Sequence, residues 1–168
     1  MHKKAVLTPV LLALVLAPSA SAARPFLDAE SGLSFQPPAG WTEVKATGAS
    51  AAFKTPKPVE GSWPSLNLIV TTSATPITEQ VVREGLAEVR RSVPNIQNYS
   101  EKRVRMAGAD AYLLAYDGTG QGRTLHSDQL IIVKGNRVYT LTGMARSSLS
   151  ARYSPLFQQV FQSVKFTR

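Results

Sequence analysis

The chain has 168 residues, a formal net charge of +8 and no cysteine. Without cysteine there can be no disulfide, no thiolate metal site and no cysteine-linked lipid anchor. The length is that of one ordinary domain, and the moderate positive charge permits weak attraction to anionic surfaces without specifying a ligand.

The first residues, Met1–Ala22, have the three zones of a cleavable secretory signal. Lys3 and Lys4 precede an apolar run over 5–17, and small residues end at Ala22. That run is shorter than the roughly 20 residues that a membrane-spanning helix needs. We expect cleavage after Ala22, export to a periplasmic or extracellular location, and one soluble domain over residues 23–168. A retained signal anchor or a buried helix is the less favoured alternative.

The first part of the expected domain has the alternating pattern of short strands. Residues 23–31 are polar and predict a flexible lead-in. Strands are then predicted by alternation and β-propensity, with a proline-glycine corner after the first and a proline-rich loop over 55–64 before the last. These four strands are expected at 33–36, 41–44, 51–54 and 65–72.

Helical periodicity replaces alternation between Ile77 and Val93. Apolar residues recur at the spacing of one helix face, Thr78 has the chemistry of an N-cap, and Pro94 ends the pattern. The tail repeats this periodicity from Tyr153 to Val164. There Ser154 is the predicted N-cap and Pro155 the first helical residue, with a shorter turn over 147–152 leading in.

Four further strands are expected between these helices, at 100–106, 111–116, 124–133 and 138–145. Glycine-, aspartate- and asparagine-containing turns join them, which predicts an antiparallel meander. Its middle strands are apolar without alternation, so both faces need a cover. We therefore predict an α+β fold, with a central antiparallel sheet of about six to eight strands and helices on both faces.

Two motifs have the composition of catalytic or phosphate-binding sites but the wrong context. Gly118, Gly120 and Gly122 resemble a phosphate-binding loop, yet a strand follows them where such a loop needs a helix, so a hairpin tip is favoured. His126-Ser127-Asp128 holds the residue types of a hydrolase triad, but strand alternation points Ser127 away from its neighbours. A hydrogen-bonded or solvated histidine is the favoured interpretation.

Ligands for metals and cofactors are sparse in this sequence. His126 is the one histidine beyond the leader, cysteine is absent, and the eleven acidic residues are scattered. We therefore predict no metal, no cofactor and no catalytic residue.

Two segments are candidate partner-binding surfaces. One is the proline-rich loop with Trp63, although anchoring of the loop itself is favoured there. The other is a basic stretch, for which a solvated outer strand protected by charge is the favoured alternative. Its residues are Arg90, Arg91, Lys102, Arg103 and Arg105.

The order of several short motifs resembles the PsbP and DcrB-like family of exported or lumenal domains. The motifs are Phe35 to Trp41, Phe53 to Pro56, Gln129 to Val133 followed by Tyr139-x-Leu141, and Phe157 to Ser163. The resemblance implies an α-β-α sandwich around an antiparallel sheet and an accessory or binding role, and it supplies no catalytic residues.

Three functions follow as hypotheses. The leading one is an exported, non-enzymatic domain that binds a protein or an envelope component, with no specific nucleic-acid binding. The second is a carrier of a small molecule or lipid in a cavity between sheet and helix. The third is a hydrolase that uses His126.

Overall fold

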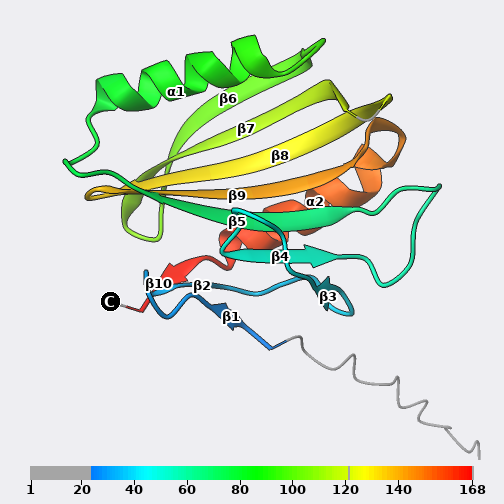
Figure 1. Cartoon of the computed structure of the whole chain (residues 1–168), viewed down its shortest axis with the longest axis horizontal. Coiled ribbons are helices and arrows are strands. Elements are labelled where there is room, and N and C mark those ends of the chain that lie inside the picture. The colour runs from blue at the N-terminus through cyan, green and yellow to red at the C-terminus, as the bar shows by residue number, and fades with distance from the viewer. Residues whose placement is uncertain (1–23, 121, 168) are drawn as a thin grey trace, which may run out of the picture.

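The computed structural model describes residues 24–120 and 122–167, so the predicted leader lies outside the described residues. Its main sheet has seven antiparallel strands in the order β3-β4-β5-β9-β8-β7-β6 (Figure 1). Their bounds are β3 Thr42–Glu43, β4 Ala51–Lys54, β5 Ser65–Thr72, β6 Gln97–Met106, β7 Ala109–Gly120, β8 Arg123–Lys134 and β9 Arg137–Arg146.

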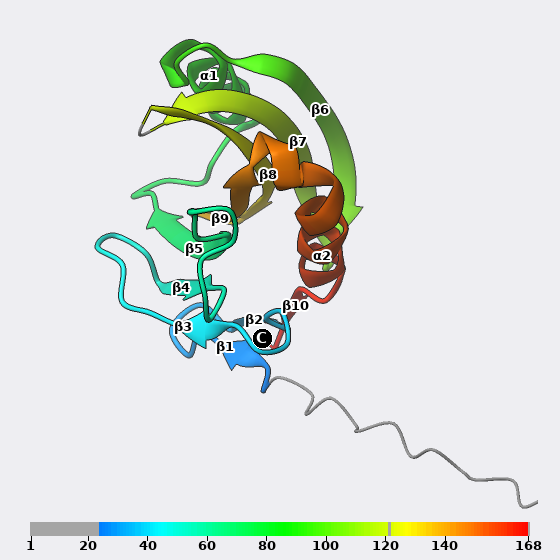
Figure 2. The same cartoon turned by 90° about the vertical axis from the view of Figure 1, so that its right-hand side faces the viewer.

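Two helices flank this sheet, as predicted. Helix α1 spans Glu79–Ser92, and α2 spans Ser150–Gln162 directly after the short 3-10 helix η1, Ser147–Leu149. Figure 2 shows α1 and α2 on opposite sides of the curved sheet. The α+β class and the antiparallel sheet with helices on both faces are confirmed. None of the helices in the described part of the chain is long and apolar enough to cross a membrane.

The faces of the sheet carry cores of unequal size. On the α2 side, Phe157 and Phe161 are fully buried in a cluster that includes Leu66, Leu130 and Leu141. On the α1 side, the buried cluster among the described residues consists of Leu86, Tyr112, Leu114 and Tyr116. Because neighbouring residues of a strand point to opposite faces, the apolar run of the middle strands supplies both cores.

A second, three-stranded sheet closes the α2 side, and the sequence did not predict it as such. Strand β2, Leu33–Phe35, pairs with β1, Phe26–Leu27, and with β10, Lys165–Phe166. The prediction of a flexible lead-in over 23–31 was therefore wrong at Phe26, whose ring lies 5.1 Å from that of Phe35. Two-residue strands are too short to show alternation, so the pattern could not reveal them.

The predicted start of the C-terminal helix was also wrong. Helix α2 begins at Ser150, and Pro155 lies inside it. Ser154 does not cap the helix, because its Oγ donates to Asp128 Oδ2 at 2.7 Å. In α1, by contrast, Thr78 is the N-cap as predicted, and its Oγ1 accepts a hydrogen bond from the Val81 amide at 3.4 Å.

Candidate functional site

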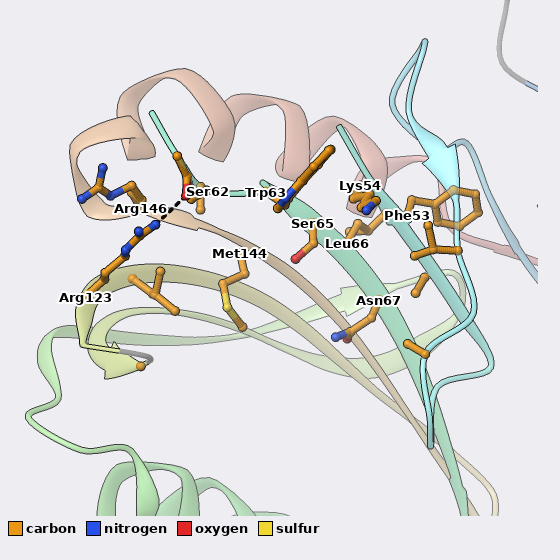
Figure 3. A pocket seen from close by; sticks show the side chains of 17 residues that line it. Phe53, Lys54, Ser62, Trp63, Ser65, Leu66, Asn67, Arg123, Met144 and Arg146 are labelled. Carbon is orange, nitrogen blue, oxygen red and sulfur yellow. Dashed lines mark hydrogen bonds between the residues drawn. The ribbon is translucent and has the colours of Figure 1, made fainter. Parts of the chain in front are cut away.

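A groove of about 410 Å³ opens on the α1 side of the sheet, beside the loop that connects β4 to β5 (Figure 3). Strands β4, β5, β8 and β9 provide its floor and walls, and the loop provides its rim. Its lining includes the side chains of Lys54, Trp63, Asn67, Arg123, Met144 and Arg146. We call this the Trp63 groove.

Two arginines hold the loop in place. Arg123 at the start of β8 donates from Nη1 to the Gly61 carbonyl at 2.6 Å, and Arg146 at the end of β9 donates from Nη1 to the Glu60 carbonyl at 2.7 Å. Glu60 and Gly61 both have positive φ, at 48° and 69°, so their carbonyls are presented by a tight reversal of the chain. The loop is thus anchored by arginines from the sheet.

Trp63 itself remains available to a partner. Its side chain is 45% exposed, and the Lys54 Nζ lies 4.0 Å from the centre of the indole ring. A cation over an aromatic face is attracted by the ring quadrupole, which keeps both groups in place on the rim. The sequence analysis favoured Trp63 as the anchor of its own loop. The contact with Lys54 is compatible with that role, and Arg123 and Arg146 add hydrogen bonds to the same loop.

The charge of the Trp63 groove is of one sign. Lys54, Arg123 and Arg146 line it, and no aspartate or glutamate is among the described residues that do. The apolar side chains of Leu125 and Met144 line another part of it. Such a site can bind an anionic ligand that also has an apolar part.

Four of the predicted basic residues lie on α1 and the outer strand β6, and three of these four pair with acidic side chains. Arg90 Nη2 lies 3.1 Å from Glu101 Oε2, and its guanidinium stacks on the Tyr99 ring at 4.2 Å. Arg91 pairs with Glu88 within the helix, at 2.7 Å. The contacts of Arg90 join α1 to β6, and the ion pair of Arg91 lies within the surface of α1.

The two arginines of β6 have partners as well. Arg103 lies 3.6 Å from Glu79 and 3.3 Å from Asp110, and Arg105 donates to the Gly108 carbonyl at 3.3 Å. Lys102 is exposed and points to the other face of β6, since it is paired with Leu113 in the register. The structure therefore does not gather the five basic residues into one uniform patch.

Trp63 and the basic residues of β6 also belong to different surfaces. Trp63 follows β4 near one edge of the sheet, and β6 is the opposite edge, with β9, β8 and β7 between β5 and β6. The sequence placed both among the candidate binding residues, but it had no means of showing that they are separated by the width of the sheet.

His126 lies between two aspartates on the α2 side of the sheet. Its Nδ1 is 2.9 Å from Asp117 Oδ1, and its Nε2 is 3.4 Å from Asp128 Oδ2. The hairpin register places Asp117 directly opposite His126, and Asp128 follows two residues later on the same face. The sequence missed Asp117, because only the register of the β7–β8 hairpin brings it there.

The serine hydroxyls near His126 donate hydrogen bonds to the two carboxylates, and the imidazole contacts the same carboxylates. Ser147 Oγ donates to Asp117 Oδ1 at 2.9 Å, and Ser154 Oγ donates to Asp128 Oδ2 at 2.7 Å. A serine nucleophile must instead hydrogen-bond to the imidazole that takes its proton. The arrangement links β7 and β8 to η1 and α2, and its geometry is not that of a hydrolase triad.

The two aspartates also favour the charged form of the imidazole. The hydrogen bond with Asp128 raises the pKa of His126 above its ordinary value, against the effect of burial and with help from Asp117. Burial opposes ionisation of Asp117, but hydrogen bonds from Asn98, His126 and Ser147 outweigh it and lower the pKa of that carboxyl. The cluster therefore favours an ion pair once the imidazole is protonated, and its hydrogen bonds link β7 and β8 to η1 and α2.

Neither the glycine motif nor the acidic residues provide a further site. Gly118 and Gly120 end β7, and β8 follows at Arg123, so the glycines belong to a hairpin, as predicted. A Cβ at Gly118 would lie 2.5 Å from Val93 Cγ1, which explains one of the three glycines by packing. No group of three or more His, Cys, Asp or Glu side chains in the described part of the chain could hold a metal ion.

A second cavity, of about 320 Å³, lies between α1 and the sheet. Its walls are apolar side chains of the helix and of β8 and β9, with the Gln129 amide on the sheet side. The apolar members include Val82, Leu86, Val89, Ile131 and Val138. It exists because α1 buries only Leu86, so the helix covers this half of the sheet incompletely.

Comparison with protein families gives one match, in which the family model described as PsbP covers residues 21–166. Comparison with curated proteins finds no match. Solved structures show the same fold at low sequence identity, which carries no argument about function by itself.

Three of these structures differ in source organism and in TM-score. LpqN of Mycobacterium tuberculosis, described as involved in cell envelope biogenesis, has a TM-score of 0.69 and 15% identity over 86% of this chain and 90% of its own. Cyanobacterial PsbP, CyanoP, of Synechocystis sp. PCC 6803 has a TM-score of 0.64 and 15% identity over 89% and 96%. A Pseudomonas aeruginosa protein of unknown function, described as a putative regulator, has a TM-score of 0.58 and 18% identity over 73% and 94%.

Proposed function

Because the chain belongs to the PsbP family, we propose that it is a non-catalytic accessory domain that binds a protein partner or an envelope component through the Trp63 groove. The observation that carries this proposal is the half-exposed Trp63 on the rim of a groove lined by three cations. Tryptophan and arginine are the residues most enriched among those that dominate binding energy at protein interfaces.

The position and the partners of His126 support a binding role over catalysis. His126 lies on the other face of the sheet and is engaged by Asp117 and Asp128, so it is not free to act as a general base. The hydrolase hypothesis loses its main support for this reason.

Export and domain organisation remain part of the proposal. The leader at residues 1–22 has the pattern of a secretory signal, and residues 23–168 are then one domain. The fold neighbour LpqN is described as involved in cell envelope biogenesis, which supports a location in the envelope for this chain too.

Site-specific crosslinking tests the binding role. We would replace Trp63 by the photoreactive aromatic residue benzoylphenylalanine in the full chain, expressed in its native cells, and irradiate them. A saturable adduct that unlabelled protein competes away is expected. The control carries the same residue at exposed Lys102 on β6. Absence of an adduct at position 63, or equal adducts at both positions, contradicts the proposal.

A second candidate function, the carriage of a small apolar molecule or lipid, is favoured by the cavity under α1. Its walls are apolar, and α1 covers it with few buried contacts, so the helix can be displaced at low cost. Native mass spectrometry of protein purified from its own cells should then show a bound adduct, lost on substitution of Val82 by Trp, which fills the cavity. A clean apo mass counts against the carrier.

A further inference from the structure

The Trp63 groove has features that indicate the chemistry of its binding partner. This inference rests on the function proposed above. Each of its two arginines uses one N–H on the loop, at Gly61 or Glu60. A guanidinium has five N–H donors in all, so each keeps several for a ligand. Together with Lys54, they present three cations to an occupant without any lining carboxylate to compete.

An apolar extension of the groove lies next to these cations. A smaller hollow of about 190 Å³ shares Gly120, Leu125 and Met144 with the Trp63 groove, and it continues toward Val93 and Tyr116. An occupant that places an anionic group near Arg123 can therefore place an apolar side chain against Leu125 and Met144.

The floor of the groove favours a peptide over a hydrocarbon chain. Asn67 on β5 lines the groove, and among the described residues its buried Oδ1 has no hydrogen-bond partner (Figure 3). A buried unpaired acceptor costs about 1–3 kcal/mol. Rotation of the amide toward the backbone N–H of a bound peptide would remove this cost, whereas an acyl chain has no donor to offer.

From these three features we propose that the occupant of the Trp63 groove is an extended acidic segment of a partner protein that carries at least one apolar side chain. Its carboxylates lie against Lys54, Arg123 and Arg146, its apolar side chain enters the hollow beside Met144, and its backbone hydrogen-bonds to Asn67. An anionic lipid surface is the alternative occupant that the test must distinguish from an acidic peptide segment.

Selection of peptides from a random displayed library on the purified, immobilised protein tests this class without assuming a sequence. The recovered peptides should be rich in aspartate and glutamate with interspersed apolar residues. Their binding should weaken in Lys54→Glu by about tenfold or more, and it should weaken as salt is raised from about 50 to 500 mM.

The matched control is Lys102→Glu, which makes the same charge change on exposed β6. Lys54 and Lys102 donate no anchoring hydrogen bond to the loop, so both variants should keep the fold, and their thermal unfolding is compared first. Recovered peptides without an acidic excess, equal losses in both variants, or no recovered peptide overturn the proposal. So does Lys54-dependent binding of phosphatidylglycerol vesicles that displaces the peptides, because the occupant is then a membrane surface.

The two proposals fail in distinguishable ways. If crosslinking from position 63 captures a saturable partner but selection yields no acidic peptides, only the partner chemistry is wrong. If neither experiment yields a ligand, the binding role of the groove is wrong as well.

Discussion

At the scale of single residues, the most consequential contact is that of His126 with Asp117 and Asp128. Its side chain is 15% exposed and that of Asp128 is 4% exposed, so solvent screens the pair little. Hydrogen bonds to charged groups contribute more than neutral ones, about 1.5–3 kcal/mol each. We expect this cluster to join η1 and α2 to the hairpin of β7 and β8.

His126→Gln should lower the free energy of unfolding by about 2 kcal/mol at mildly acidic pH. Because the pKa of His126 is raised, its stabilising contribution is complete below the ordinary value of 6.5 and is lost as the pH rises through the raised value. Because the pKa of Asp117 is lowered, its contribution is present above the ordinary value of 3.8 and is lost as the pH falls through the lowered value.

The protein should therefore be most stable between about pH 4 and 6.5, with a decline above neutral pH that His126→Gln lacks. Urea unfolding at a series of pH values measures this. The same decline in the variant would mean that another group is responsible.

Gly143 illustrates a packing requirement that sequence cannot reveal. It lies in β9 beneath α2, and a Cβ there would come within 2.2 Å of the Phe157 ring. Gly143→Ala should destabilise the protein by roughly 1–3 kcal/mol through overpacking. The matched control is Gly85→Ala in α1, where a Cβ meets nothing within 4 Å. That change should stabilise by about 0.5–1 kcal/mol. Thermal unfolding of both variants checks the opposite signs, and a destabilised Gly85→Ala would show that α1 is held differently.

At the scale of elements, the sequence predicted the long strands and both helices because their periodicity extends over many residues. It failed where an element is short or where a side chain has a competing partner. Strands β1 and β10 have two residues each. Ser154 has the chemistry of an N-cap, but its hydroxyl donates to Asp128. Helix α2 has already begun four residues earlier, at Ser150, directly after η1.

Pro155 gives a prediction about α2. It lies in the sixth position of the helix, so its ring replaces an amide that could donate to the Ala151 carbonyl. Pro155→Ala should restore that hydrogen bond and stabilise the protein by about 1 kcal/mol, after allowing for the greater freedom of the unfolded chain. Denaturant unfolding at constant pH measures the change. A loss of stability would indicate that the proline ring makes a packing contact worth more than the hydrogen bond.

At the scale of the whole molecule, the candidate site depends on elements that are distant in sequence. Trp63 was recognised from its loop, whereas Arg123 and Arg146 were not. Their positions follow from the pairing of Leu125 with Arg146 across β8 and β9, and from the path of a loop that no pattern predicts. Conversely, the basic residues near Arg103 were recognised, but their acidic partners Glu79 and Glu101 were not, because each ion pair joins α1 to β6.

Because the two cores differ in size, we expect α1 and α2 to detach from the sheet in separate opening events. Helix α2 buries Tyr153, Phe157, Val160 and Phe161, whereas α1 buries only Leu86. Local opening requires less free energy where fewer apolar side chains are buried. Amide hydrogens of α1 should therefore exchange faster than those of α2, under conditions where the sheet remains protected.

Salt should accentuate this difference, because the surface pairs of Arg90 with Glu101 and of Arg103 with Glu79 contribute to holding α1 on β6. Hydrogen exchange with mass spectrometry at low and high salt measures both effects, and Glu101→Gln should mimic high salt at α1 alone. If α1 and α2 exchange at the same rate, the domain opens as one unit, and the cavity under α1 is then closed to an incoming apolar molecule unless the whole domain unfolds.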